Sequence, residues 1–98
     1  MLIEPQPEGF YYCDSSTYRS FIIQMDRLTQ DGQVIIAKHG ICPAAKSYYQ
    51  NGAIIVKNNY TFTEATTAQM KHLMKCAKLG RFIGASRAND IVETYSIF

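Results

Sequence analysis

Residues 18–28, YRSFIIQMDRL, form the stretch from which the fold is predicted. Its apolar residues follow one another at spacings of 3, 1, 3 and 3, which place them on one stripe of a helix. The preceding Ser15 and Ser16 offer side-chain oxygens for an N-cap, and Gly32 offers the left-handed conformation of a C-cap. The sequence therefore predicts a first amphipathic helix, with Ile23 on its polar side. The predicted stripe consists of Tyr18, Phe21, Ile22, Met25 and Leu28.

A second amphipathic helix is predicted to end at Leu79, directly before Gly80. Thr61-Phe-Thr-Glu64 has the spacing of a capping box, in which a threonine and a glutamate satisfy N–H groups at the start of a helix. Thr63 is an alternative cap. The predicted inner face consists of Met70, Leu73, Met74 and Ala77, and the nearly opposite face of Lys71, Lys75 and Lys78.

Short β-prone runs surround the two predicted helices, and Asn51-Gly52 is a strong signal for the tight turn of a hairpin. The order of elements predicts an α+β, ferredoxin-like βαββαβ sandwich, in which two helices pack on one face of a four- or five-stranded antiparallel sheet. The predicted strands are residues 10–13, 34–37, 47–49, 53–56 and 91–98. The predicted core consists of Phe21, Ile22, Met25, Leu28, Val34, Ile36, Ile55, Leu73, Met74 and Ala77.

The chain of 98 residues has the length of one domain. Residues 1–9, with two prolines and a glycine, are expected to be an extended lead-in, and residues 10–98 a single α+β domain. No apolar run approaches the roughly 20 residues of a membrane span, and the N-terminus lacks the basic and apolar regions of a signal peptide. We therefore expect no membrane partner and a cytoplasmic location, which for a viral protein would be the cytoplasm of the host cell.

Two histidines and two cysteines are the candidate ligands of a metal ion. His39 and Cys42 flank a glycine, and His72 and Cys76 are four residues apart on one face of the second predicted helix. Nitrogen and sulfur ligands of this kind suit zinc, although the first pair does not have the usual Cys-x-x-Cys spacing. The odd number of cysteines, three, argues against a disulfide framework. We predict no bound metal, no cofactor and no disulfide.

The residues predicted to bind a partner are basic or aromatic: Lys71, Lys75, Lys78, Arg81, Tyr48 and Tyr49. Tyrosine, of which the chain has seven, is enriched at protein interfaces. The sequence contains no paired carboxylates and no glycine-rich phosphate loop. We therefore predict a non-enzymatic protein that binds a larger protein or complex, as an inhibitor or modulator of the kind encoded by phages and mobile elements. It could also form a homodimer.

Two other functions are open at this stage. A small RNA- or DNA-binding module would stack bases on aromatic side chains of the sheet, but the net charge is only +2 and the run at residues 34–37 is aliphatic. A zinc-binding or thiol-dependent enzyme would use the histidines and cysteines named above, for example Cys42 as a nucleophile with His39 or His72 as its base.

Overall fold

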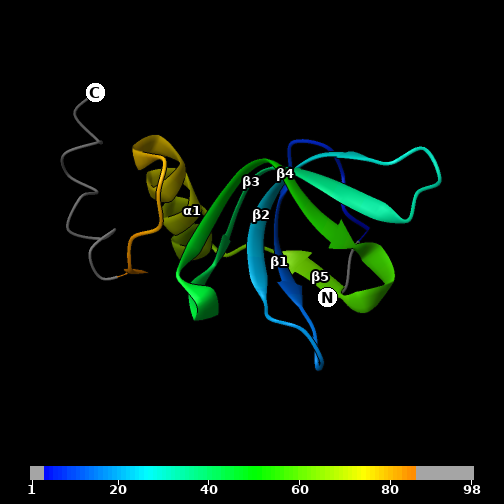
Figure 1. The fold of residues 1–98 in the computed structure, drawn as a ribbon, viewed down its shortest axis with the longest axis horizontal. Helices are drawn as coiled ribbons and strands as arrows, with labels where there is room; N and C mark the ends of the chain where they lie inside the picture. Colours follow the sequence, from blue (N-terminus) through cyan, green and yellow to red (C-terminus); the bar gives the residue numbers. More distant parts are fainter. Residues whose placement is uncertain (1–3, 86–98) are drawn as a thin grey trace.

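The computed structural model describes residues 4–85, which form one curled antiparallel sheet with one α-helix against it (Figure 1). The strands lie in the order β4-β3-β2-β1-β5, so the last strand returns to pair with the first. The elements are β1 (Phe10–Asp14), β2 (Phe21–Leu28), β3 (Val34–Cys42), the 3₁₀ turn η1 (Pro43–Ala45), β4 (Ser47–Val56), the 3₁₀ turn η2 (Lys57–Asn59), β5 (Thr61–Glu64) and α1 (Thr67–Leu79). The prediction of a ferredoxin-like βαββαβ sandwich with two helices is wrong.

The first predicted helix is the strand β2. Its helical spacing arises because both faces of this strand are covered: Ile22 belongs to one buried cluster, while Ile23 and Met25 belong to another. A bulge around Asp26 then shifts the alternation of side chains, so that Leu28 again packs against the cluster of Ile23 and Met25. Ile23, expected on a polar face, has no exposed surface. The two adjacent β-branched isoleucines also favour a strand over a helix.

The predicted hairpin around Asn51-Gly52 is instead a bulge within one continuous strand, β4. Ala37 pairs with Ala53 and His39 with Gln50, so one residue of β3 lies opposite two residues of β4. Asn51 has a φ of 50°, which asparagine tolerates better than most residues. The Asn-Gly pair therefore bends the strand without reversing the chain.

The second predicted helix is present as α1 and ends at Leu79, with Gly80 at a φ of 71° as its C-cap. Its start is different, because residues 61–64 form β5. The capping box consists of Thr66, whose hydroxyl accepts the N–H of Gln69 at 3.1 Å, and Gln69, whose side-chain oxygen accepts the N–H of Thr66 at 2.8 Å.

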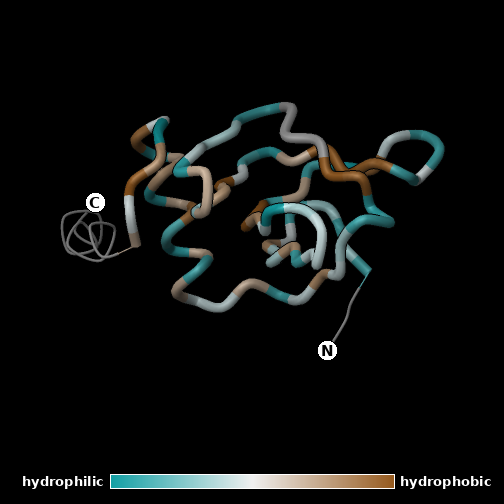
Figure 2. Tube along the Cα trace, turned by 60° about the horizontal axis from the view of Figure 1, so that its bottom comes forward, coloured by the Kyte–Doolittle hydropathy of each residue, from teal (hydrophilic) through white to brown (hydrophobic). Residues whose placement is uncertain are grey.

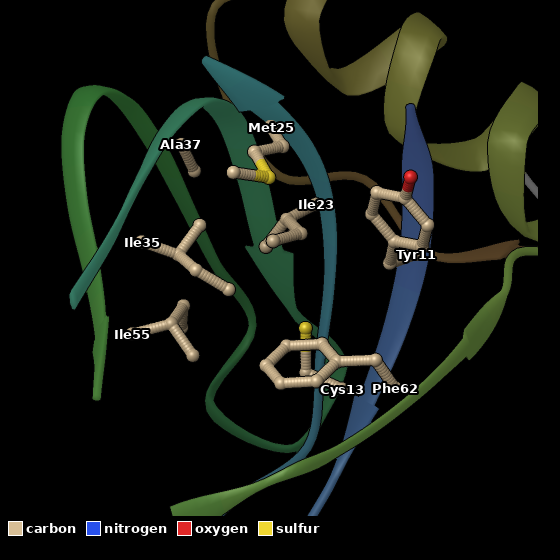
Figure 3. Close-up of a cluster of buried hydrophobic side chains, with 8 residues drawn as sticks. All are labelled: Tyr11, Cys13, Ile23, Met25, Ile35, Ala37, Ile55 and Phe62. Atoms are coloured by element: carbon tan, nitrogen blue, oxygen red, sulfur yellow. The ribbon is translucent and has the colours of Figure 1, made fainter. Parts of the chain in front are cut away.

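One buried cluster, the inner cluster, fills the concave side of the sheet (Figure 3). All five strands contribute to it, and their side chains point toward a common interior. Its members are Tyr11, Cys13, Ile23, Met25, Ile35, Ala37, Ile55 and Phe62. Figure 2 shows the hydrophobic stretch that begins β3 beside the hydrophilic loop between β2 and β3. A curled sheet can thus enclose a core without a second layer.

The second buried cluster, the outer cluster, lies on the opposite face, where α1 packs. Tyr12, Ile22, Ile41 and Tyr48 are paired in register across β1, β2, β3 and β4 and form one row under the helix. The helix contributes Leu73 and Cys76, and Ile83 follows from the segment after it; these three side chains are 0–3% exposed. The sheet is therefore covered by its own curl on one face and by α1 on the other.

The predicted core is confirmed in part. Ile22, Met25, Ile55 and Leu73 are buried, whereas Met74 is 47% exposed. The other predicted members (Phe21, Leu28, Val34, Ile36 and Ala77) are half-buried. The helix is rotated relative to the prediction, because it presents His72, Leu73 and Cys76 inward in place of Met70, Leu73 and Met74.

The structure describes most of the predicted lead-in, but it does not describe the predicted C-terminal strand. In the lead-in, the N–H of Glu8 donates to the carbonyl of Met25 at 2.8 Å, and the N–H of Met25 donates to the carbonyl of Gly9 at 2.9 Å. The strand predicted at residues 91–98 lies outside the described residues.

We expect Leu73→Ala to lower the free energy of unfolding by about 2–5 kcal/mol, because it removes a fully buried side chain and leaves a cavity between α1 and the sheet. Met74→Ala, one position along, should change it by less than about 0.5 kcal/mol, because the side chain is largely exposed. Urea denaturation of the two variants provides the measurement. Equal losses of stability would mean that the helix faces the sheet differently.

Candidate binding surfaces

The structure divides the predicted lysine stripe of α1. Lys71 and Lys78 are exposed, as is Arg81 just beyond the helix, but Lys75 is only 6% exposed. Met70 and Met74, both predicted on the inner face of this helix, are 36% and 47% exposed. We call the exposed residues Met70, Lys71, Met74 and Lys78 the helix surface. The helix surface carries fewer positive charges, and is more apolar, than the lysine face predicted from the sequence.

Lys75 is a buried lysine whose ammonium group has no hydrogen-bond partner among residues 4–85. Burial lowers the pKa of Lys75 below its ordinary value, and the neighbouring charge of Lys71 lowers it further. A buried donor without a partner carries the full cost of its lost hydration. Lys75 therefore opposes folding and is not available to contact a partner.

The four candidate metal ligands are already engaged or buried. His72 Nε2 lies 2.6 Å from the carbonyl oxygen of Ile83, and the N–H of Ile83 donates to Sγ of Cys76 at 3.4 Å. On β3, His39 Nδ1 lies 2.8 Å from the hydroxyl of Tyr48, and Cys42 is 1% exposed. Among residues 4–85, no three histidine, cysteine or acidic side chains converge as a metal site would require.

The three thiols are all free and buried, which does not suit a nucleophile. Burial raises the pKa of Cys13 to about 12. Burial also raises the pKa of Cys76, partly offset by its hydrogen bond with Ile83. Both groups are therefore protonated at neutral pH, and the thiolate required for nucleophilic attack is scarce.

A row of four aromatic side chains, which we call the aromatic ridge, lies at the end of the sheet where β2 begins. Its members are Tyr18, Tyr60, Phe21 and Tyr49. Adjacent ring centroids are 6.2, 6.0 and 6.1 Å apart in that order, with interplanar angles of 35°, 70° and 57°. These distances and tilts are those of attractive aromatic pairs. Tyr18 is 52% exposed and Tyr49 is 38% exposed.

Local hydrogen bonds position Tyr18 at one end of the ridge. The hydroxyl oxygen of Ser15 accepts the N–H groups of Thr17 and Tyr18 at 3.1 and 3.0 Å, which forms a compact turn between β1 and β2. Tyr60 directly follows the turn η2, and its N–H donates to the carbonyl of Lys57 at 3.3 Å. Turns at two distant points of the sequence thus bring their tyrosines together.

A shallow hollow of about 310 Å³ adjoins the ridge at Tyr60. Polar residues of the β1–β2 turn and of η2 line it. Asp14 is the only one of these lining residues that is charged at neutral pH, and one of its carboxylate oxygens accepts a hydrogen bond from the hydroxyl of Ser20 at 3.1 Å. The hollow therefore combines an aromatic wall with one negative charge.

The predicted pair Tyr48 and Tyr49 separates between the two faces of the sheet. Tyr48 packs against the outer cluster and contacts His39, whereas Tyr49 belongs to the ridge. Sequence reasoning missed Tyr18, Phe21 and Tyr60 as a surface, because Tyr18 and Phe21 were assigned to a helix. Their positions in the chain carry no periodic signal, since the ridge depends on how β2, β4 and two turns meet in space.

No known family model matches this chain, and no curated protein or solved structure is significantly similar to it. Within residues 4–85 there is also no helix with the length and apolar character of a membrane span. The chemistry of the surfaces above is therefore the basis for assigning a function.

We expect Lys75→Met to raise the free energy of unfolding by about 1–3 kcal/mol, because methionine fills a similar volume without an unpaired buried donor. Lys71→Met, at an exposed position, should change it by less than about 0.5 kcal/mol. Chemical denaturation at pH 7 gives both values.

The advantage of Lys75→Met should shrink as the pH rises toward 10.5, the ordinary lysine value. Between the lowered pKa of the folded protein and 10.5, the unfolded chain binds more protons, so the parent protein gains stability as the pH rises. A difference that stays constant between pH 7 and pH 10 would show that the Lys75 ammonium is not desolvated in the fold.

Native thiols should react with a disulfide reagent at pH 8 only as fast as the protein opens, because all three are buried and Cys13 is protonated. In guanidinium chloride all three should react at once, which serves as the control. A thiol that reacts rapidly in the native protein would favour the thiol-dependent enzyme instead.

Proposed function

We propose that this protein is a non-enzymatic binder of a larger protein or complex, and that it makes contact through the aromatic ridge. The proposal rests on the aromatic ridge. Tyr18 and Tyr49, at its two ends, expose large rings to solvent. Tyrosine supplies contact area with few rotatable bonds, and it is frequent among residues that dominate binding energy.

The contacts between the rings favour binding because they hold the ridge in one conformation before a partner arrives. Each ring touches the next at a centroid distance of about 6 Å, and Phe21 and Tyr60 are also packed against the inner cluster. Side chains that are already ordered lose less conformational entropy on association. Occupying the surface of its partner in this way would make the protein an inhibitor or modulator.

The helix surface is the weaker candidate. Lys75 of its lysine stripe is buried, and its exposed apolar part consists of Met70, which lines a hollow of about 200 Å³ beside β1, and Met74. Exposed methionines that occur singly or in pairs are common on protein surfaces and require no function. The helix surface therefore serves as the control surface in the experiment below.

Single-stranded nucleic acid is the alternative ligand of an aromatic surface, but its sites usually join the aromatic rings to a positively charged groove. The hollow beside the ridge carries Asp14 and no cation. Lys71, Lys78 and Arg81 belong to α1 and the residue pair after it, and α1 packs on the opposite face of the sheet. Arg19, directly after Tyr18, is exposed, but no basic side chain lines the hollow itself. The charge of the hollow thus favours a protein partner.

The test is retention of the partner that co-purifies with the tagged protein from its native host. Tyr18→Ala with Tyr49→Ala should weaken binding by at least about 2 kcal/mol, because truncation of a central aromatic contact typically costs that much. The control, Lys71→Ala with Met74→Ala, should bind like the parent protein. Circular dichroism must show that both variants are folded. If the tyrosine variant binds normally and the helix variant does not, the contact surface is α1.

A further inference from the structure

We infer that the aromatic ridge receives an extended, proline-containing segment of the partner in the polyproline II conformation, with a lysine or arginine of that segment facing Asp14. The inference rests on the proposed function and specifies the chemistry of the partner. It follows from the tilts of the rings, the length of the ridge and the charge of the hollow.

The tilts of the rings favour a proline ring over a flat nucleic-acid base. Adjacent rings are inclined at 35°, 70° and 57° to one another, so no two of them present parallel faces. A base would need an open ring face parallel to its own plane, as in a stacking platform. A pyrrolidine ring is compact and puckered, and aromatic-lined grooves are a recurrent way of binding proline-rich segments.

The ridge is long enough for at most two turns of a polyproline II helix. The path from Tyr18 to Tyr49 comprises three centroid separations of 6.0–6.2 Å. Polyproline II has three residues per turn and advances about 9 Å per turn. Residues i and i+3 of such a segment face the same side, so two prolines at that spacing would reach two successive parts of the ridge.

The polar groups around the ridge match the remaining requirements of an extended segment. A polyproline II backbone makes no internal hydrogen bonds, so its carbonyl groups need external donors. The side-chain amide of Asn59 in the wall of the hollow is a donor of this kind, and that of Asn58 keeps one N–H beyond its hydrogen bond to Gln33. Asp14 keeps acceptor sites beyond its hydrogen bond with Ser20, which gives a cation on the segment a place to bind.

The experiment selects ligands for the purified protein from a displayed library of fully randomised dodecapeptides. We expect enrichment of sequences with two prolines three residues apart and a lysine or arginine on one side of them. Enrichment of a motif without prolines, of acidic peptides, or of nothing would overturn the inference. Labelled single-stranded DNA and RNA of twelve nucleotides are measured in parallel, and ridge-dependent binding of either, tighter than that of the selected peptide, would also overturn it.

Binding measurements on variants then show where the selected peptide binds. Tyr49→Ala should weaken its binding about 30-fold or more, the fold-change of a typical hot spot, while Tyr49→Phe should retain most of the affinity. Asp14→Asn should weaken it about threefold to fivefold and reduce its salt dependence, as expected for one exposed charge pair. Met74→Ala is the control. A peptide whose affinity is unaffected by Tyr49→Ala binds elsewhere and overturns the inference.

The failure of this inference is distinguishable from failure of the proposed function. If the library returns no proline motif while the natural partner still depends on Tyr18 and Tyr49, the ridge binds a protein of other chemistry. If the natural partner does not depend on these tyrosines, the proposed contact surface is itself wrong.

Discussion

The pairing of β2 with β1 and β3 is the interaction on which the rest of the structure depends. Consecutive side chains of a strand point to opposite faces, and β2 places Ile22 and Ile23 side by side in its sequence. Both are buried, so each face of the sheet needs its own cover. The curl of the sheet encloses Ile23, and α1 covers Ile22. Losing either cover would expose one isoleucine of this central strand to water, at a cost of about 1.5–3 kcal/mol for that side chain alone.

The curl also creates the candidate binding surface. Phe21 and Tyr49 belong to β2 and β4, which are separated by β3, and yet their rings are 6.1 Å apart. Bulges in β2, β3 and β4 strengthen the local bend, since an extra residue in one strand increases its twist. A flat sheet would leave these two rings about two strand spacings apart, which is close to 10 Å. The curl of the sheet brings the two rings closer than this, and Gly40, which pairs with Tyr49 on the intervening β3, has no side chain to separate them.

Elements that depend on local signals could be predicted from the sequence. The end of α1 at Leu79 follows from Gly80, and the strand at residues 34–37 follows from a continuous β-branched run. What could not be predicted depends on which faces are covered. The spacing in residues 18–28 imitates a helix because both faces of β2 are buried and a bulge shifts its phase. The rotation of α1, which buries Lys75 and exposes Met74, is likewise set by packing against the sheet, and hydrophobicity alone favours the opposite.

The alternation of side chains between the two faces of β2 and β4 connects the packing of α1 to the geometry of the ridge. Phe21 and Tyr49 lie in the ridge, and the residue beside each in the sequence, Ile22 and Tyr48, packs in the outer cluster under α1. The position of a ridge ring is thus set by a neighbouring side chain held on the opposite face. We therefore expect weakened packing of α1 to disturb the two strand positions that carry these rings. The helix, although it lies on the far side of the sheet, in this sense supports the candidate binding surface.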